Sequence, residues 1–351
     1  MSKIEGKKEQ KKKVLIVVTS HDVLGKTGYP TGLWLSELTH PYFELANHGI
    51  EVDIASPKGG KAPIDPYSDP RSPKSINKQD LISTGFLNSS DLVEKINNTK
   101  RLSDINPKDY DAVLFTGGNG AIFDYSDNAN VQKTVRSMWE SGKIVSTVCH
   151  GGSALLNVKL ANGENLLKGM TVTAFDNEEE KITQQQIGTE YLPFYLEDEM
   201  PKRGTTFKHA SPFTPFVVVS GGGRLITGQQ NFSGSAIGKK LVEVLSMQEE
   251  HTARTMKIFA YDVAKPGVTL NDIKPHLKEE AIHAWNLYKR GIIRENYLRI
   301  DKPGAVIVLE CTDVEEARRI TSEFPLVKAG LIEFEFMPVG AFTPYEGLFA
   351  K

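Results

Sequence analysis

Cysteine is scarce in this chain of 351 residues, which contains only Cys149 and Cys311. Two cysteines exclude a disulfide scaffold and a four-cysteine zinc site, and they fit a reducing compartment. The sequence also lacks any apolar run near the roughly 20 residues that cross a bilayer. Its N-terminus has no apolar core of the kind that a secretion signal carries. We therefore expect a cytoplasmic protein that has no membrane partner.

An excess of basic charge is also missing, since the formal net charge is −2. The first thirteen residues hold six lysines and two glutamates, a charge of +4 that leaves −6 for the rest. We interpret residues 1–12 as a disordered basic tail, and the acidic remainder argues against nucleic acid as a partner. Hydrophobic residues (39%) and charged residues (25%) are in the balance of a soluble globular protein.

Short apolar runs alternate with amphipathic patterns through the first two thirds of the chain. The runs predict strands at 14–18, 51–55, 112–115 and 144–148, and the patterns predict helices at 33–48, 131–139 and 235–245. This alternation is typical of a doubly wound, mostly parallel sheet of the flavodoxin-like kind. The Pro- and Gly-rich stretch 56–75 predicts a long surface loop before helical patterns resume near Ser90, and loops of that length often carry function.

A polar run at residues 248–255 predicts a linker between two domains. We place an α/β domain at 13–248 and a smaller domain at 256–351. The smaller domain has a strand-helix-strand-strand-helix-strand pattern at 257–263, 277–290, 293–300, 305–311, 314–323 and 332–339. That order is typical of a ferredoxin-like α+β fold.

Cys149 stands directly after a predicted buried strand, in the sequence Val-Cys-His-Gly-Gly. The glycines allow a sharp turn into a helix, as in a nucleophile elbow, and the free N–H groups of that turn would lower the pKa of the thiol and form an oxyanion hole. A lone cysteine can also be a small buried hydrophobe. A second glycine turn at 116–120 follows the preceding strand, so both turns lie at the carboxyl edge where open sheets bind ligands.

Four sequence motifs resemble the ThiJ/PfpI superfamily, which is class I glutamine amidotransferase-like. They are Cys-His-Gly at Cys149, Gly-Gly-x-Gly at Gly117, Ser-Glu-Leu-Thr-His-Pro-Tyr at Ser36, and Thr-Gly-Gln-Gln-Asn at 227–231. The resemblance extends over residues 13–245 and is greatest to the branch of glyoxalase III enzymes and heat-shock chaperones. Two positions depart from the family, and both affect the shape of the pocket: Asn119 stands where histidine is common, and Gly152 where proline is common.

The resemblance implies a catalytic quartet. The nucleophile falls on Cys149, the histidine on His150, the glutamate of the first helix on Glu37 and the triad acid on Glu180, with Glu178 and Glu179 as competitors for that last role. The oxyanion and substrate-binding positions are Gly117, Gly118, Asn119 and Gly151. We expect no metal and no cofactor.

These residue types suit a glutathione-independent glyoxalase that turns methylglyoxal into lactate. A thiolate adds to an aldehyde to give a hemithioacetal, and His150 and Glu37 move protons through an enediol to a thioester that water hydrolyses. Glu37 and the thiolate are costly to charge together, so one of them holds a proton at rest. The partner is then a small-molecule aldehyde. A cysteine peptidase or amidase and a stress chaperone remain alternatives from the same superfamily.

The C-terminal residues resemble the YciI-like and muconolactone isomerase-like dimeric α+β barrels, particularly at 284–288, 299–310 and 325–330. That resemblance implies a homodimer. His276 and His283 are seven residues apart on one predicted helix, where surface or core positions are the simpler interpretation than a ligand site. Cys311 ends an apolar strand, and we interpret it as structural.

Overall fold

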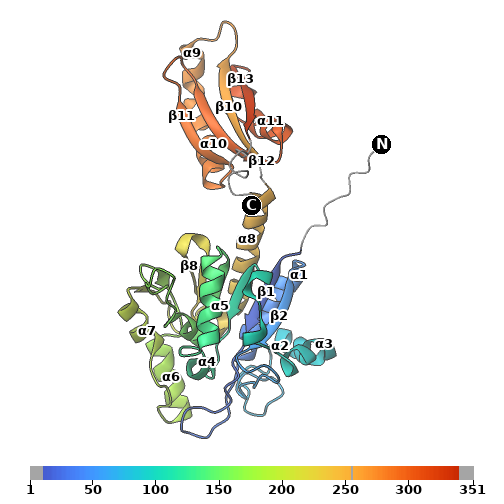
Figure 1. Cartoon of the computed structure of the whole chain (residues 1–351), viewed down its shortest axis with the longest axis vertical. Coiled ribbons are helices and arrows are strands. Elements are labelled where there is room, and N and C mark those ends of the chain that lie inside the picture. The colour runs from blue at the N-terminus through green and yellow to red at the C-terminus, as the bar shows by residue number, and fades with distance from the viewer. Residues whose placement is uncertain (1–10, 254–255, 340–351) are drawn as a thin grey trace, which may run out of the picture. The chain divides into compact units, whose positions relative to one another are not determined.

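The computed structural model describes residues 11–253 and 256–339. The chain divides between Leu245 and Ser246 into two compact units, each with its own main sheet (Figure 1). Most of the predicted basic tail lies outside the described residues. Lys12 is described, and its ammonium group lies 3.7 Å from the Asp111 carboxylate.

The first unit is built on a seven-stranded sheet of order β3-β2-β1-β4-β5-β9-β8. All neighbouring strands are parallel except β8, which is antiparallel to β9. The predicted doubly wound, mostly parallel sheet is therefore confirmed. The strands are β1 (Lys13–Val17), β2 (Glu51–Ser56), β3 (Lys100–Arg101), β4 (Ala112–Phe115), β5 (Ile144–Val148), β8 (Val217–Ser220) and β9 (Leu225–Gly228).

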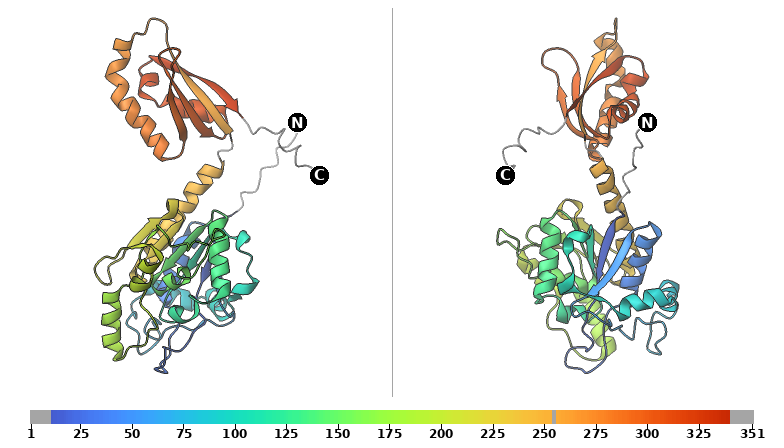
Figure 2. Two further views of the ribbon diagram at one scale, coloured as in Figure 1. Left: turned by 60° about the vertical axis from the view of Figure 1, so that its left-hand side comes forward. Right: turned by 45° about the vertical axis from the view of Figure 1, so that its right-hand side comes forward.

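Helices cover both faces of this sheet, as Figure 2 shows. Alternate residues of a strand point to opposite faces, so Val14 and Ile16 of β1 pack in one core and Leu15 and Val17 in the other. The first core includes α1 (Leu35–Asn47) and α8 (Gly234–Ala253), and the second includes α5 (Ala129–Glu140). A parallel sheet buried on both faces has only its strand ends free to carry a site.

Shorter elements fill the connections between the strands. They are α2 (Leu81–Asn88), α3 (Ser90–Asn97), α4 (Ala121–Asp124), α6 (Asn177–Ile187), α7 (Leu196–Glu199) and the small parallel pair β6 (Thr171–Val172) and β7 (Thr206–Phe207). Helical structure resumes after the long loop at Leu81 rather than near Ser90. The reason is Asp80, whose carboxylate accepts hydrogen bonds from the N–H groups of Ile82 and Ser83 and so caps α2.

The prediction of a linker at residues 248–255 is wrong for most of that run, because α8 continues as a helix to Ala253. The polar run contains neither glycine nor proline before that residue and is rich in glutamine and glutamate, which are good helix formers. A polar composition there therefore does not mark the end of the helix. The remaining two linker residues lie outside the described part of the chain.

The second unit is a four-stranded antiparallel sheet of order β11-β12-β10-β13. With strands numbered within the unit, this is the 4-1-3-2 order of a ferredoxin-like fold, which confirms the predicted class. Its elements are β10 (Met256–Ala264), α9 (Leu270–Ile273), α10 (Leu277–Lys289), β11 (Ile293–Leu298), β12 (Ala305–Cys311), α11 (Val314–Ser322), α12 (Pro325–Lys328) and β13 (Ile332–Val339). Ile258 and Leu309 face the helices and share a core with Leu287 and Ala317.

Candidate active site

Cys149 lies at a sharp turn between β5 and a seven-residue 3₁₀ helix, Cys149–Leu155. Its φ of 58° is left-handed, a conformation that costs a non-glycine residue about 1–3 kcal/mol and occurs mostly at functional sites. The turn needs glycine two residues later, because a Cβ on Gly151 would lie 2.2 Å from the Phe115 carbonyl oxygen. The backbone therefore holds the sulfur at the carboxyl edge of the sheet.

His150 connects the cysteine to a buried carboxylate. Its Nδ1 atom lies 3.6 Å from the Cys149 sulfur, and its Nε2 atom lies 2.8 Å from Oε1 of Glu180. Burial opposes charge on the imidazole, but the carboxylates of Glu180, Glu37 and Glu179 together outweigh burial and raise the pKa of His150. The ring therefore has an oriented carboxylate on one side and the sulfur on the other, as acid-base catalysis requires.

The three consecutive glutamates at the start of α6 have three different environments. Glu178 is exposed to solvent. Glu179 forms a capping box with Asp176 and accepts the backbone N–H of Phe213 at 2.7 Å. Glu180, fully buried, is the one that bonds to His150. Of these three glutamates, Glu180 is therefore the one placed to orient His150.

Glu37 reaches the cysteine from the first turn of α1 and is fully buried. Its Oε2 atom accepts the Gly117 N–H at 2.7 Å, and burial raises the pKa of Glu37 to about 8 although hydrogen bonds from Cys149 and Gly117 lower it. The carboxyl group therefore exchanges its proton near neutral pH.

The thiol does not have the lowered pKa that the elbow alone suggested. Backbone N–H groups of His150 and Gly118 favour the thiolate, but burial and the Glu37 carboxylate outweigh them and raise the pKa of Cys149 well above its ordinary value. These surroundings favour the thiol over the thiolate, so a proton acceptor in contact with the sulfur would assist formation of the thiolate. Glu37 is that contact.

A cavity of about 380 Å³ opens over this group. Glu37, Cys149, His150, Gly118 and Asn119 line it. The other lining residues are Trp34, Tyr67, Ile76, Asn77, Phe175, Thr183, Gln186, Ile187, Phe213, Asn231 and Phe232. We call this cavity the Cys149 chamber. No lysine or arginine is among the described residues that line it, so His150 is the one basic side chain in the described lining.

The four predicted oxyanion positions have different contacts. The N–H of Gly117 is taken by Glu37, and a Cβ at Gly117 would lie 2.7 Å from the His150 nitrogen. Gly118 directs its N–H to the sulfur. Asn119 lines the chamber and accepts a hydrogen bond from Tyr191 at 3.1 Å. Gly151 packs against β4 and is not part of the lining.

Gly152, the second departure from the family pattern, fits tightly between neighbouring side chains. A Cβ there would lie 2.8 Å from the methyl carbon of Met200 and 3.1 Å from Cβ of Ala174. A side chain at this position would therefore displace the end of Met200 and press on Ala174.

Sequence reasoning missed the aromatic part of the chamber, namely Trp34, Phe175, Phe213 and Phe232. Phe175 stands 4.8 Å from the His150 ring and 6.5 Å from the ring of Phe213. One signal did exist, because the long loop predicted to carry function supplies Tyr67.

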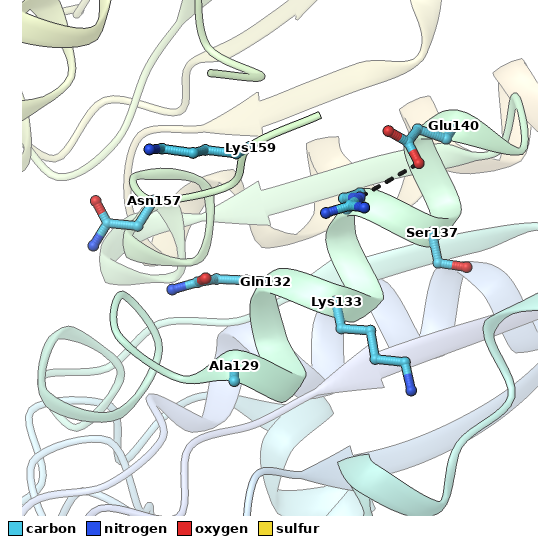
Figure 3. A pocket seen from close by; sticks show the side chains of 8 residues that line it. Ala129, Gln132, Lys133, Ser137, Glu140, Asn157 and Lys159 are labelled. Carbon is cyan, nitrogen blue, oxygen red and sulfur yellow. Dashed lines mark ion pairs between the residues drawn. The ribbon is translucent and has the colours of Figure 1, made fainter. Parts of the chain in front are cut away.

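Outside this chamber, a shallower hollow of about 540 Å³ runs along α5 (Figure 3). It is lined by polar and charged side chains such as Gln132, Lys133 and Lys159, and its Arg136 is paired with Glu140 at 3.5 Å. It shares no residue with the Cys149 chamber. Among the residues that the structure describes, no group of three or more histidine, cysteine or acidic side chains is placed to hold a metal ion, and no helix is long and apolar enough to cross a membrane.

Comparison with known proteins gives the class of this protein. A family model described as the DJ-1/PfpI family matches residues 31–243. This match extends over more than half of the chain, so the chain belongs to the DJ-1/PfpI family.

Particular relatives point to one branch of that family. The glutathione-independent glyoxalase HSP31 of Saccharomyces cerevisiae is 30% identical over 245 residues, which are 67% of this chain and 98% of that protein. Glyoxalase 3 of Candida albicans is 30% identical over 220 residues, 62% of this chain and 91% of that protein.

Solved structures agree with this placement. The Francisella tularensis Rapid Encystment Protein 24 KDa is 38% identical with a TM-score of 0.61, and the match covers 67% of this chain and 99% of that one. The crystal structure of glyoxalase III from Candida albicans is 28% identical with a TM-score of 0.57, covering 66% of this chain and 96% of that one.

Proposed function

We propose that this protein is a glutathione-independent glyoxalase that converts methylglyoxal and water into lactate through a hemithioacetal on Cys149. The observation that carries the proposal is the meeting of Cys149, His150, Glu37 and Glu180 in one chamber. The glyoxalase names of the relatives at about 30% identity support the same substrate class. In this proposal the enzyme is a lyase with a cysteine nucleophile.

The first step is addition of sulfur to the aldehyde. The thiol proton passes to Glu37, whose pKa of about 8 suits it to accept and return a proton near neutral pH. The sulfur then forms a bond to the aldehyde carbon, and the carbonyl electron pair moves to oxygen. His150 supplies the proton for that oxygen, and the Glu180 carboxylate stabilises the imidazolium before it does so.

The second step moves hydrogen between the two carbons of the hemithioacetal. Neutral His150 removes the proton from the former aldehyde carbon, and Glu37 protonates the neighbouring carbonyl oxygen, which gives an enediol. Return of a proton to the second carbon and loss of one from the first hydroxyl leave a thioester. Water then attacks the thioester carbon, the carbon–sulfur bond breaks, and lactate leaves with the thiol restored.

A glutathione-free assay tests this proposal. Purified chain is mixed with methylglyoxal, and loss of the dicarbonyl and formation of D-lactate are followed for the wild type, Cys149→Ser and the matched control Cys311→Ser. We expect activity in the wild type and the control and none in Cys149→Ser, because a serine hydroxyl is not ionised at neutral pH. Full activity of Cys149→Ser would end the mechanism. Hydrolysis of peptides, or suppression of protein aggregation without any dicarbonyl loss, would favour the peptidase or chaperone alternatives instead.

We further propose that the second unit is a YciI-like dimerising domain and that the protein works as a cytoplasmic homodimer. The sheet face away from the helices is apolar at its centre, where Phe259 is opposite Val308 and Met337, and Tyr261 is opposite Val306. Val308 is already buried, whereas Met337 is 45% exposed and Phe259 and Tyr261 are partly exposed, and a second copy of this face would cover these three side chains. Neither Cys149 nor Cys311 forms a disulfide, which fits a reducing compartment.

A further inference from the structure

The Cys149 chamber is large for methylglyoxal. That molecule has five non-hydrogen atoms and, at no more than about 30 Å³ each, the volume of a liquid water molecule, fills at most about 150 Å³. The chamber has about 380 Å³. More than half of the space would therefore be left beyond the reacting carbons.

The unfilled part has an apolar wall that extends to the mouth of the chamber. Ile76 is 68% exposed and Phe232 is 53% exposed, yet both line the chamber. Side chains of this size are seldom left in water together unless they form a binding surface. Since no described lining residue is a lysine or arginine, the wall suits an uncharged apolar group.

Phe213 forms part of this wall in a strained conformation. Its φ is 58°, which makes it the second described non-glycine residue, after Cys149, with a left-handed backbone. Its N–H donates to Glu179 at 2.7 Å, and its ring meets Phe175 edge-on at 6.5 Å. Strain of this kind persists only where the surroundings fix it, and it gathers at ligand sites. The side chain is thus held in place at the wall.

Two polar groups of the lining have no partner in the described structure. The indole N–H of Trp34 and the amide nitrogen of Asn77 are both buried and make no hydrogen bond. Buried donors without partners are costly, and a ligand that brings oxygen atoms removes that cost. A dicarbonyl brings two oxygen atoms.

We propose that the preferred substrates are 2-oxoaldehydes with a long alkyl or aromatic substituent, whose dicarbonyl end binds at Cys149 and the Trp34 and Asn77 donors, and whose substituent packs against Phe213, Phe232 and Ile76. This inference rests on the proposed glyoxalase function. The chemistry is unchanged, with the 2-oxoaldehyde and water giving the corresponding 2-hydroxy acid. Phe213 and Phe232 are then specificity-determining residues.

The test is a substrate series in the full chain. kcat/KM is measured without glutathione for methylglyoxal, 2-oxopentanal, 2-oxoheptanal and phenylglyoxal, and each value is divided by the rate at which the same aldehyde reacts with a small free thiol. Each methylene that enters the apolar wall should raise kcat/KM about fourfold. We therefore expect a rise of about 10-fold or more from methylglyoxal to 2-oxopentanal.

Variants locate the effect. Phe232→Ala and Phe213→Ala should each lower the ratio of kcat/KM for 2-oxoheptanal to that for methylglyoxal by about 10-fold, the scale of losing an aromatic contact. Phe43→Ala removes a phenylalanine that is similarly exposed (49%) on α1 but is not in the lining, and it should leave the ratio unchanged. Circular dichroism checks that each variant is folded.

The outcomes separate the two proposals. A series that rises with chain length and flattens in the Phe232 and Phe213 variants supports the inference. If methylglyoxal is turned over but the normalised kcat/KM stays constant or falls as the substituent lengthens, the inference is overturned and the glyoxalase function stands. A rise that all three variants retain also overturns it, because the wall would not be responsible. Failure to turn over any 2-oxoaldehyde removes both.

Discussion

Replacing Glu37 by glutamine should remove one large pH-dependent contribution to the stability of the first unit. In the wild type, burial raises the pKa of Glu37 to about 8 from an ordinary value of 4.5. A folded-state pKa above the unfolded one means that the folded chain binds more protons between these values. The contribution of Glu37 to stability is therefore fully present below pH 4.5 and is lost as the pH rises through 8.

The size of this effect follows from the two pKa values. Each unit of pKa difference corresponds to about 1.4 kcal/mol, so the wild type should lose about 3 kcal/mol of unfolding free energy to this one group between pH 5 and pH 8. Glutamine has the same shape, and its oxygen can still accept the Gly117 N–H. Glu37→Gln should therefore keep the fold and lack this loss. Asp124 and Glu179 also have raised pKa values, but they are present in both proteins and cancel in the comparison.

The assay is urea unfolding of both proteins at several values between pH 5 and pH 8. Tryptophan fluorescence is read in a Trp285→Phe background, so that Trp34 and Trp139 report on the first unit alone. The difference in unfolding free energy between Glu37→Gln and wild type should grow by about 3 kcal/mol over this range. Turnover of methylglyoxal by Glu37→Gln should fall about 100-fold or more, because a proton acceptor is lost.

Equal pH slopes for the two proteins would refute this reasoning. They would mean that Glu37 is ionised throughout the range or reaches water in the folded state. A variant that is stabilised as expected but turns over methylglyoxal at the wild-type rate would keep the electrostatics and remove Glu37 from the mechanism.

Three further predictions concern the triad acid, the packing at Gly152 and the role of the second unit. Glu180→Gln should lower kcat about 100-fold and shift the acid limb of the pH-rate profile. Glu178→Gln, on the exposed face of the same turn, should match the wild type. If both variants lower kcat equally, the assignment of Glu180 as the triad acid would be wrong. Gly152→Ala should lower the free energy of unfolding by urea by about 1–3 kcal/mol. Gly85→Ala, with open space around it, should not lower it. Equal stability of the two variants would show that the side chains around the elbow repack. The fragment 1–253 should remain active and be monomeric by light scattering where the full chain is dimeric, and a folded but inactive fragment would contradict this.

Much of the fold could be predicted because it depends on short-range signals. β4 and β5 were predicted to the residue, since a run of four or five residues that is apolar in β4 and mostly β-branched in β5, between polar or glycine turns, favours a buried strand. The end of α8 was missed for a physical reason. A polar composition does not show where a helix ends. Residues 248–253 are mostly polar and still continue α8.

The residues of the site could also be predicted only in part. Cys149 and His150 are adjacent in the sequence, so the elbow was visible in it. The raised pKa of the thiol was not, because it depends on burial and on a carboxylate that α1 brings from 112 residues away. The sequence does not show which of the three glutamates faces His150. That depends on where α6 begins, and the Asp176 cap sets this start. Phe213 and Phe232 reach the chamber outside any periodic pattern, so no sequence rule could assign them.

The absence of lysine and arginine from the described lining of the Cys149 chamber has a consequence for the durability of the catalyst. Aldehydes condense with primary amines to form Schiff bases, and 2-oxoaldehydes attack guanidinium groups as well. An enzyme that concentrates such reagents exposes its own wall to them on every cycle. The described lining consists of apolar and aromatic side chains, amides, the hydroxyl groups of Tyr67 and Thr183, and the Cys149, His150 and Glu37 groups, so it contains no primary amine or guanidinium. In the proposed glyoxalase, this lining would leave the substrate no lysine or arginine side chain to modify inside the chamber.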